Sequence, residues 1–459
     1  MSMTSLVNTA GVSAGAFKGA SGAMERDPYA PTYEIIVRGG QGAQPVVIND
    51  QLKQYITEIT FEDNAEQFDH LTIVLENQID QQGGGGVLSI VDSMLFAEGH
   101  ILEVQMGWGK TLFTVGAATI VKKTPSFPEN GNPTLVIEAY DPLYKMARSS
   151  PRGGAVYKNT SPTLIVREIG QRSGFGVDGL GPDNAPAIEV MPPLGLTQSY
   201  TQKRGVNDYT FLSKLANIYG REIYARYDSS NGKYNLFFRK PALEAQKEVF
   251  TFVYNEGDIS YTNTLLSFEP TLDAYDQATD FEIYLIKDGE KSGTKFDFID
   301  KLTIAEQAKL KEEQQRRFTG GNLATGGKQD PNFDGVSVGF KAFGRSFRFP
   351  QHKRFKNEAE AVKEIEAFIQ RQRENFITGT GKLIGLEVLQ SRQVHKLEGI
   401  TAQFSGKYFF TKVTHIMNKT NGYECEFSCR KLIEDTIVQA PPTLDLSEND
   451  ETIKKLKGQ

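Results

Sequence analysis

The residues most able to do chemistry in this chain are two cysteines and five histidines: Cys425, Cys429, His70, His100, His352, His395 and His415. No histidine stands in the spacing of a metal-binding motif, and cysteine and histidine form no cluster. The cysteines alternate with polar residues as in a strand and lie four residues apart, roughly 13 Å along a strand, which is too far for a disulfide. We therefore expect a buried strand face there, in preference to a metal or redox site. His415 lies in an apolar strand pattern, where a satisfied or interfacial histidine is expected rather than a base.

Two glycine-rich stretches resemble parts of phosphate-binding loops. Residues 107–111 read Gly-Trp-Gly-Lys-Thr, but Val104 occupies the position of the first glycine of such a loop. This stretch also lies between predicted strands, whereas a phosphate loop opens a helix. Gly379-Thr380-Gly381 lacks the third glycine of a dinucleotide loop, because Ile384 is there, and we expect a turn. The sequence predicts no nucleotide cofactor.

The stretch after residue 329 resembles the first half of a calcium loop. Asp330, Asn332 and Asp334 are suitably spaced, but Lys341 stands where a bidentate glutamate is needed, so we expect a solvated loop. The basic and aromatic stretch 345–356 could bind an acidic partner, although a solvated surface or a protein interface is favoured. Carboxylates are plentiful, so a glycosidase-like pair is neither located nor excluded. These patterns predict no catalytic residue, no cofactor and no metal, and hence no enzyme.

The composition limits the function classes further. A chain of 459 residues predicts two to four domains, and its net charge of −6 argues against a basic nucleic-acid groove. No run approaches the roughly 18 apolar residues of a membrane span, and no secretory signal is visible. Residues 1–31 are small and polar, which predicts a flexible arm that orders against a partner. The lack of a disulfide framework is compatible with assembly in a reducing cytoplasm.

The first part of the chain predicts short strands. Between residues 33 and 144, six stretches rich in β-branched or aromatic residues are separated by Gly, Asn and Pro, a pattern typical of a sandwich or barrel. A single helical turn is expected at Asp92–Ala97. The six predicted strands are Tyr33–Val37, Tyr55–Phe61, Leu71–Leu75, Ile101–Met106, Leu112–Val115 and Leu135–Ala139.

The middle of the chain predicts a small α/β module. The Ser161–Pro162 pair favours a helix over residues 162–172, with an N-cap serine and proline in the first turn. Asp208 is expected to cap a second helix, which Gly220 ends. A hairpin then turns at Asn231–Gly232.

The last part returns to strands after an interruption. Strands are predicted within 261–286 and again over 383–432. The polar stretch 287–357 reads as an insertion with a charged helical run at 304–317. An amphipathic helix is expected over 358–376. Residues after 434 read as an extended, charged tail.

An internal repeat connects the two ends of the chain. Gly109-Lys110-Thr111-Leu112-Phe113-Thr114 corresponds to Gly406-Lys407-Tyr408-Phe409-Phe410-Thr411, and an apolar strand and a Lys-Thr pair follow both. A glycine, Gly99 or Gly399, precedes each motif. Two copies of one barrel, separated by inserted modules, would explain this order, with coincidence as the alternative.

Five short motifs follow one another in the C-terminal part of the chain. They are Gly385-Leu386-Glu387-Val388, Leu397-Glu398-Gly399-Ile400, Ser405-Gly406-Lys407-Tyr408, Val413-Thr414-His415 and Gly422-Tyr423-Glu424-Cys425. In this order they resemble the late-control protein D family, the baseplate hubs of contractile phage tails, to which the hub portion of the type VI secretion spike protein is related. In the middle of the chain, Asn207-Asp208-Tyr209-Thr210-Phe211-Leu212 resembles the start of the family's helix. The resemblance covers roughly residues 33–434.

The resemblance implies a structural role. Family members are trimers that adapt the six-fold tail tube to a three-fold central spike, because each subunit supplies two similar tube-like barrels. The implied partners are two further copies of the chain, tail tube proteins, the central spike protein, the tape-measure protein and wedge or sheath-proximal baseplate proteins. DNA or cargo would pass through the lumen without specific binding. The implied location is a virion tail baseplate or an extracellular injection particle, assembled in the host cytoplasm.

The expected fold is a β-rich α+β class, with two related tube-like β-barrel domains separated by a small α/β module and an insertion. Two other functions stay open, a tail-associated cell-wall hydrolase and a host-glycan-binding β-protein. The expected divisions are a flexible arm 1–31, a first barrel 32–147, the α/β module 148–258, a second barrel from 259–286 with 358–434, a polar insertion 287–357 and an extended tail 435–459.

Overall fold

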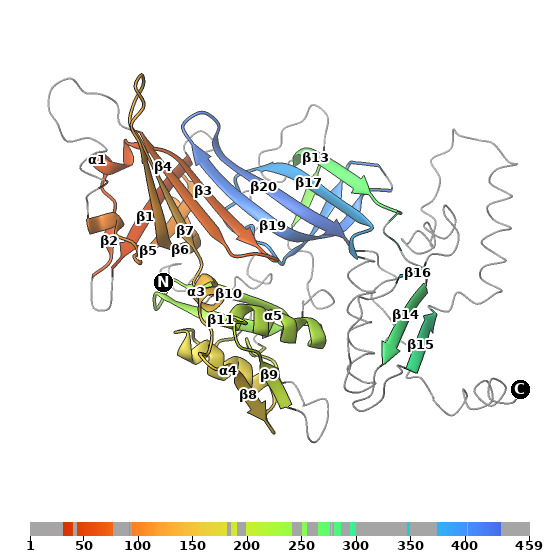
Figure 1. Ribbon diagram of the computed structural model, residues 1–459. Coiled ribbons are helices and arrows are strands. Elements are labelled where there is room, and N and C mark those ends of the chain that lie inside the picture. The colour runs from red at the N-terminus through yellow and green to blue at the C-terminus, as the bar shows by residue number, and fades with distance from the viewer. Residues whose placement is uncertain are drawn as a thin grey trace, which may run out of the picture.

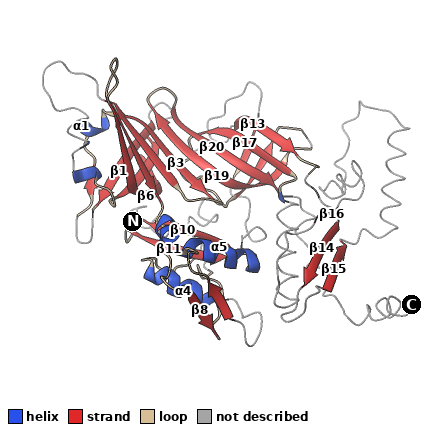
Figure 2. Cartoon of the chain, viewed as in Figure 1, coloured by secondary structure: helices blue, strands red, loops and turns tan. Residues whose placement is uncertain are grey.

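The computed structural model describes 14 stretches of the chain, and structural statements below concern these residues. It consists of a long curved sheet, a mixed module beneath it and a small separate sheet (Figures 1 and 2). The described residues are 31–39, 44–76, 91, 94–180, 185–190, 199–240, 250–254, 265–275, 277, 280–285, 294–299, 347–348, 374–401 and 403–432.

Thirteen strands form the long sheet, which runs across the molecule without a break (Figure 1). All its pairings are antiparallel except that of β12 with β18. The strand path is β13-β17-β20-β19-β3-β4-β7-β6-β5-β1-β2, and β18 pairs with both β19 and β12. The strands are β1 Pro31–Arg38, β2 Val46–Val47, β3 Ile56–Asn64, β4 His70–Glu76, β5 Ile101–Trp108, β6 Thr111–Ser126, β7 Thr134–Tyr140, β12 Thr251–Val253, β13 Leu265–Leu272, β17 Ile377–Ile384, β18 Val394–Glu398, β19 Gly406–Asn418 and β20 Gly422–Lys431.

The expected β-rich class is confirmed, and the predicted strands of the first part all lie in this sheet. The two ends of the chain, however, form one open sheet in the described residues, and neither end closes on itself. Alternation explains the core. In β20 every second side chain is buried, including Cys425 and Cys429, which form no disulfide. A single hydrophobic cluster extends along the sheet, from Ile35 in β1 to Cys429 in β20.

The α/β module lies beneath the sheet with a hydrophobic cluster of its own (Figure 1). The helix predicted at 162–172 is confirmed, with Ser161 as its N-cap. We had expected Asp208 to cap the next helix, but it does not. Asn207 accepts the N–H of Thr210, and Asp208 is the first helical residue. The elements are α3 Leu143–Arg148, β8 Ala155–Lys158, α4 Pro162–Arg172, β9 Ser199–Gln202, α5 Asp208–Tyr219, β10 Glu222–Asp228 and β11 Lys233–Arg239; α1, Asp50–Lys53, and a 3-10 turn, Met94–Phe96, flank the sheet.

A small sheet stands apart from the long one. It contains β14 (Asp280–Leu285), β15 (Thr294–Ile299) and β16 (Phe347–Arg348). We had expected β14 within the second barrel, but it pairs with strands of the 287–357 stretch. The helices predicted over 304–317 and 358–376 lie outside the described residues, apart from the last three positions of the second.

The two halves of the long sheet repeat one strand order. In the first half β3, β4, β7, β6 and β5 are neighbours in turn, and in the second half the order is β13, β17, β20, β19 and β18. The irregularities of register coincide as well. β6 and β7 have a bulge between Ile120 and Lys122, and β19 and β20 have one between Phe410 and Lys412. Since bulges are specific backbone features, their coincidence indicates that the two halves repeat one arrangement of strands.

The other hairpins carry the same correspondence. The β3–β4 register shifts between Ile56 and Glu58, and that of β13–β17 shifts between Leu265 and Ser267. The repeat inferred from sequence is therefore present, but its predicted alignment is wrong. Counted from the bulges, Gly406 corresponds to Gly116 and not to Gly109, which forms the tight turn between β5 and β6.

Candidate functional site: the joint between the halves

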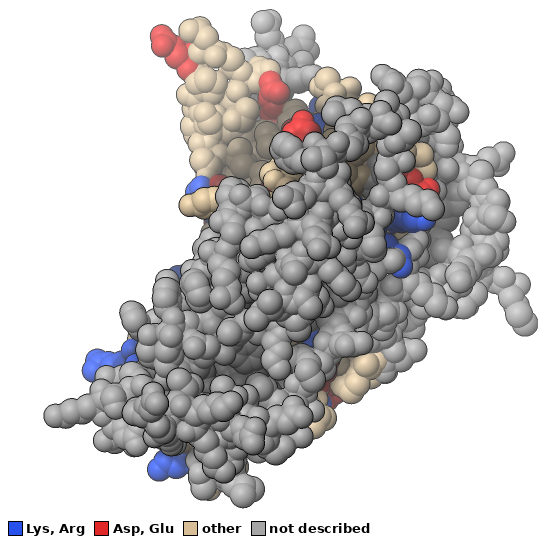
Figure 3. Space-filling view, turned by 90° about the vertical axis from the view of Figure 1, so that its right-hand side faces the viewer, with Lys and Arg blue, Asp and Glu red and all other residues tan. Residues whose placement is uncertain are grey.

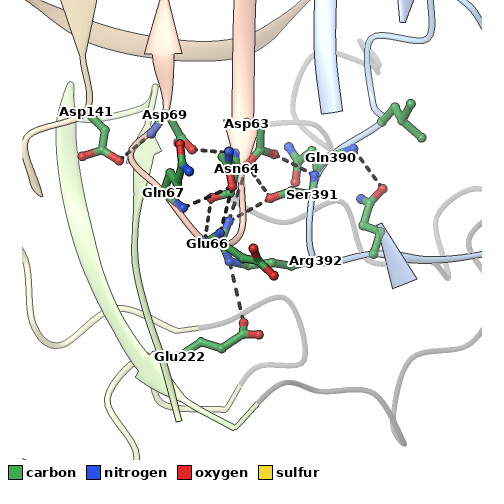
Figure 4. A network of polar contacts seen from close by, with 12 residues as sticks. Asp63, Asn64, Glu66, Gln67, Asp69, Asp141, Glu222, Gln390, Ser391 and Arg392 are labelled. Carbon is green, nitrogen blue, oxygen red and sulfur yellow. Dashed lines mark hydrogen bonds and ion pairs between the residues drawn. The ribbon is translucent and has the colours of Figure 1, made fainter. Parts of the chain in front are cut away.

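The halves meet where β3 pairs with β19. Seven antiparallel residue pairs join these strands, from Lys412 opposite Asn64 to Asn418 opposite Glu58. The partners are separated by about 350 positions in the chain, yet the ladder is as regular as those within each half. This joint turns two repeated units into one continuous sheet, and a polar network at its end holds it in place (Figure 4).

Arg392 is the centre of that network (Figure 4). It precedes β18 and donates from its Nη2 to the backbone oxygen of Asn64 at 2.9 Å. Its Nη1 donates to Ser391 Oγ at 2.8 Å and lies 3.5 Å from Asp63 Oδ1. Asp63 also accepts the Ser391 N–H at 2.8 Å. The loop before β18 is thereby tied to the end of β3.

The same guanidinium reaches the α/β module. Its Nε lies 3.8 Å from Glu222 Oε2 at the start of β10, and its Cζ stacks 4.3 Å from the centroid of the Tyr224 ring. Burial alone would lower the pKa of Arg392, but Asp63, Glu222 and Asp69 outweigh it and raise that pKa. Arg392 therefore stays charged and connects three parts of the fold, namely both halves and the module.

A chain of carboxylates extends the network towards the first half. Asp69 accepts the N–H of Asn64 at 2.9 Å, and Asp141 accepts the N–H groups of Asp69 at 3.0 Å and of Leu143 at 2.7 Å. Burial raises the pKa of Asp69 well above its ordinary range and raises that of Asp141 to about 6. The two carboxylates thus connect the β3–β4 turn to the N-terminus of α3 by hydrogen bonds.

His415 lies inside the joint, opposite Phe61 of β3. It is buried, with its Nδ1 2.7 Å from Tyr423 Oη and its Nε2 3.0 Å from the Leu389 carbonyl oxygen. The carbonyl can only accept, so Nε2 donates and Nδ1 accepts from the tyrosine. Burial lowers the pKa of His415 to about 4. The expectation of a satisfied, interfacial histidine is confirmed.

One further contact ties the halves together, and a second fits β3 closely against β6 within the first half. Trp108 at the end of β5 donates its Nε1–H to the Gly385 carbonyl at 3.0 Å, and its ring packs against Tyr423. Gly116 in β6 leaves room for the Phe61 ring, since a Cβ there would lie 1.9 Å from Phe61 Cζ. The Phe61 ring can lie directly against the backbone of residue 116 only because that residue is glycine and has no Cβ.

The motifs tested for chemistry are scattered across the fold. Residues 107–111 span the β5–β6 turn, between strands as predicted. Gly379-Thr380-Gly381 was expected to be a turn but lies within β17, paired on both sides. The calcium-like stretch at 330–334 lies outside the described residues, as does most of 345–356. In the described part of the chain no three potential metal ligands gather.

The visible charge distribution is mixed. On the described part of the face in Figure 3, acidic and basic side chains stand in small groups, without a large patch of one sign. No helix among the described residues has the length and apolar character needed to cross a membrane. The network around Arg392 holds elements of both halves and of the module in position.

Sequence reasoning missed Arg392 and Asp63. Neither stands in a motif, and they are 329 positions apart. No signal in the sequence marks either residue, and it is the structure that sets Arg392 apart, by a positive φ of 63°. Only glycine, asparagine and aspartate adopt such angles often, so an arginine there indicates that surrounding contacts hold it.

Comparison with known proteins gives the fold a context. No family model matches the chain, and no curated protein matches its sequence. Among solved structures, the 43 kDa tail protein of prophage MuSo2 from Shewanella oneidensis matches with a TM-score of 0.56 and 12% identity, over 87% of this chain and 98% of that one. The chain has a tail-protein fold. The resemblance to the baseplate hub family, drawn from motifs, is confirmed at this level.

A second tail protein supports the same fold. The tail protein from Neisseria meningitidis MC58 matches with a TM-score of 0.51 and 12% identity, covering 87% of this chain and 96% of that one. Both tail proteins are matched over nearly their whole length. The shared tail-protein fold therefore includes the long sheet together with the module, and not one half alone.

Proposed function

We propose that the chain is a structural baseplate hub of a contractile tail or injection machine, without enzymatic activity. Three copies would adapt the six-fold tail tube to the three-fold central spike, at a virion baseplate or in an extracellular injection particle. The observation that carries this proposal is the repeat within the long sheet. Three chains with two equivalent halves each present six similar units to a tube, while the chains themselves keep three-fold symmetry.

The joint supports the proposal because it shows how one unit attaches to the next. β3 and β19 continue the sheet from half to half, and the Arg392 network ties them to each other and to the module. A ring needs this step repeated between subunits. Tube-like barrels would then arise from the ring, in agreement with an open sheet in the single chain.

The division of labour among the parts is also proposed. The two halves would face the tube, and the spike, tape-measure, wedge and sheath-proximal proteins would attach elsewhere. DNA or cargo would pass through the lumen without specific binding. Assembly would take place in the host cytoplasm.

Light scattering of the purified full-length chain tests the ring. A mass three times that of the chain at micromolar concentration is expected, and class averages in electron microscopy should show six similar lobes. A stable monomer well above micromolar concentration would refute the proposal. A cell-wall zymogram is expected to show no cleared band at the position of the protein, whereas a cleared band would favour the hydrolase alternative.

A further inference from the structure

When the two halves are compared, one edge of β6 and one edge of β13 have no paired strand among the described residues. In the second half, residues 412–418 of β19 pair with β3. The corresponding stretch of β6, Lys122–Ser126, pairs on one side with β7, and no described strand covers its other side. β13 corresponds to β3, and among the described strands it pairs only with β17. These edges lie towards opposite ends of the sheet (Figure 1).

We propose that these two edges bind each other between neighbouring copies of the chain, β13 of one copy adding to β6 of the next in the register of the β3–β19 joint. The inference rests on the proposed ring and names its subunit contact. Each copy has one edge of each kind, so the contact is head-to-tail and can close a ring.

The bulges transfer the register residue by residue. In the existing joint, Thr414 lies opposite Glu62. Thr124 takes the place of Thr414, because each is two residues beyond the lysine that follows its bulge. Thr271 takes the place of Glu62, four residues beyond Ser267 as Glu62 is beyond Glu58. Thr124 of one copy should therefore face Thr271 of the next.

Side chains at the two edges fit such a contact. Phe127, just past β6, is 59% exposed, whereas its counterpart Met417 is 6% exposed beneath the existing joint. In the transferred register Phe127 faces Phe268 of the next copy, which replaces the pair of Met417 and Ile59. Lys122, which pairs with Glu138 at 2.7 Å within the chain, would also face Asp273 across the strands. An exposed aromatic side chain at a strand edge is thus covered by another.

Pro125 and Pro270 fall opposite each other in this register, at the positions of His415 and Phe61. In the existing joint Ala65 donates its N–H to β19 at 2.7 Å, and alternation points the N–H of Phe61 the same way. A proline has no such donor, so this pair lacks both of its hydrogen bonds. The transferred register confines both prolines to one pair, and the neighbouring hydrogen-bonded pairs contain none.

The same prolines protect the edges before assembly. An open edge invites pairing with any strand, and a proline whose nitrogen faces outward makes such pairing weaker. The same loss applies to the proposed contact, and the remaining pairs of the register must outweigh it.

Cysteine pairing tests the register. Residues 124 and 271 occupy a non-hydrogen-bonded pair, where the Cα atoms approach to about 4.5 Å, within reach of a disulfide. The double variant Thr124→Cys with Thr271→Cys, once oxidised, is expected to run as covalent species of up to three chains. The matched control, Thr124→Cys with Ser267→Cys, shifts one cysteine by four residues, about 13 Å, and should give no such species.

The outcomes separate the contact from the ring. A trimer by light scattering without cross-linking in Thr124→Cys with Thr271→Cys, or with equal cross-linking in the control, would overturn the contact and leave the proposed ring intact. A monomer at all concentrations would remove the ring and the contact with it. Cross-linked trimers in the matched pair alone would support both.

A second variant probes the contact without cysteines. Phe127→Asp is expected to raise the concentration at which half of the trimer dissociates by about tenfold, since a charge would be buried opposite Phe268. Val156→Asp is the control, because Val156 is 57% exposed in β8 of the module, away from the sheet edges. Equal behaviour of the two variants would count against the contact.

Discussion

Arg392 occupies in the second half of the sheet the position that Gly99 occupies in the first. Gly99 donates its N–H to the carbonyl of Ile120 at 2.9 Å, and Arg392 donates to the carbonyl of Phe410, the counterpart of Ile120, at 2.8 Å. Both have a positive φ, 91° and 63°. The second half thus accepts backbone strain at this turn in order to carry a guanidinium, and the first half does not.

Substitution at these two positions separates strain from contact. Gly99→Ala should lower the free energy of unfolding by about 1 kcal/mol, through backbone strain alone, since nothing lies within 4 Å of a Cβ there. Arg392→Ala should cost about 3 kcal/mol or more, because it leaves Asp63 without its cation. Arg392→Gly should recover about 1 kcal/mol of that loss. Urea unfolding of the three variants measures the differences, and equal midpoints for Arg392→Ala and Arg392→Gly would show that the turn is unstrained.

The close approach of Gly116 and Phe61 predicts a steep response to one methyl group. Gly116→Ala should destabilise the fold by about 1–3 kcal/mol, because the Phe61 ring must leave its place. Gly153→Ala is the matched control, since its Cβ would meet open space. Adding Phe61→Leu to Gly116→Ala should recover part of the loss in thermal unfolding. Additive effects of the two substitutions would contradict the steric explanation.

The raised pKa of Asp141 predicts that the joint is favoured by mild acid. The folded state holds this proton up to about pH 6, and the unfolded state releases it near pH 4, so the contribution to stability falls as pH rises through this window. Asp141→Asn should therefore gain stability relative to the wild type between pH 4 and pH 6. Urea midpoints across the range measure this, with exposed Asp50→Asn as control. A constant difference between variant and wild type would rule out the titration.

His415 predicts the opposite slope in the same experiment. Its pKa is lowered to about 4 in the fold, so the unfolded state takes up a proton first, near pH 6.5. Stability from this group is complete above pH 6.5 and is lost as pH falls towards 4. His415→Phe should be less stable than the wild type at pH 7, because the Leu389 carbonyl loses its donor. The gap should narrow by pH 4, and a gap that widens would contradict a neutral histidine.

Local signals predicted local structure well in this chain. The Ser161–Pro162 pair gave the start of α4, and alternation gave the strands and the buried faces of Cys425 and Cys429. The turn predicted at Gly379-Thr380-Gly381 was wrong because tertiary packing, and not a turn, requires the glycines. The rings of Phe268 and Phe427 lie where Cβ atoms of these glycines would be, so glycine serves packing here and not a turn.

Matching residue types gave a wrong alignment of the two halves, and the hydrogen-bond register of the strands gave the correct one. Gly-Lys occurs at residue 109 because a two-residue turn needs it, and at residue 406 after a longer connection. Matching the letters shifted the alignment by seven positions. The joint itself was beyond sequence reasoning, because β3 and β19 are distant in the chain and an edge carries no signature of its partner. The Arg392 network could not be predicted for the same reason.

Trp108 is the only tryptophan of the chain and therefore the only source of tryptophan fluorescence. Its indole is bound to Gly385 and packed on Tyr423, both in the other half. Its emission therefore reports one place, the junction of the halves, while circular dichroism reports every strand. If the halves part before either unfolds, the fluorescence change will precede the loss of ellipticity, and separate reporters need not be introduced.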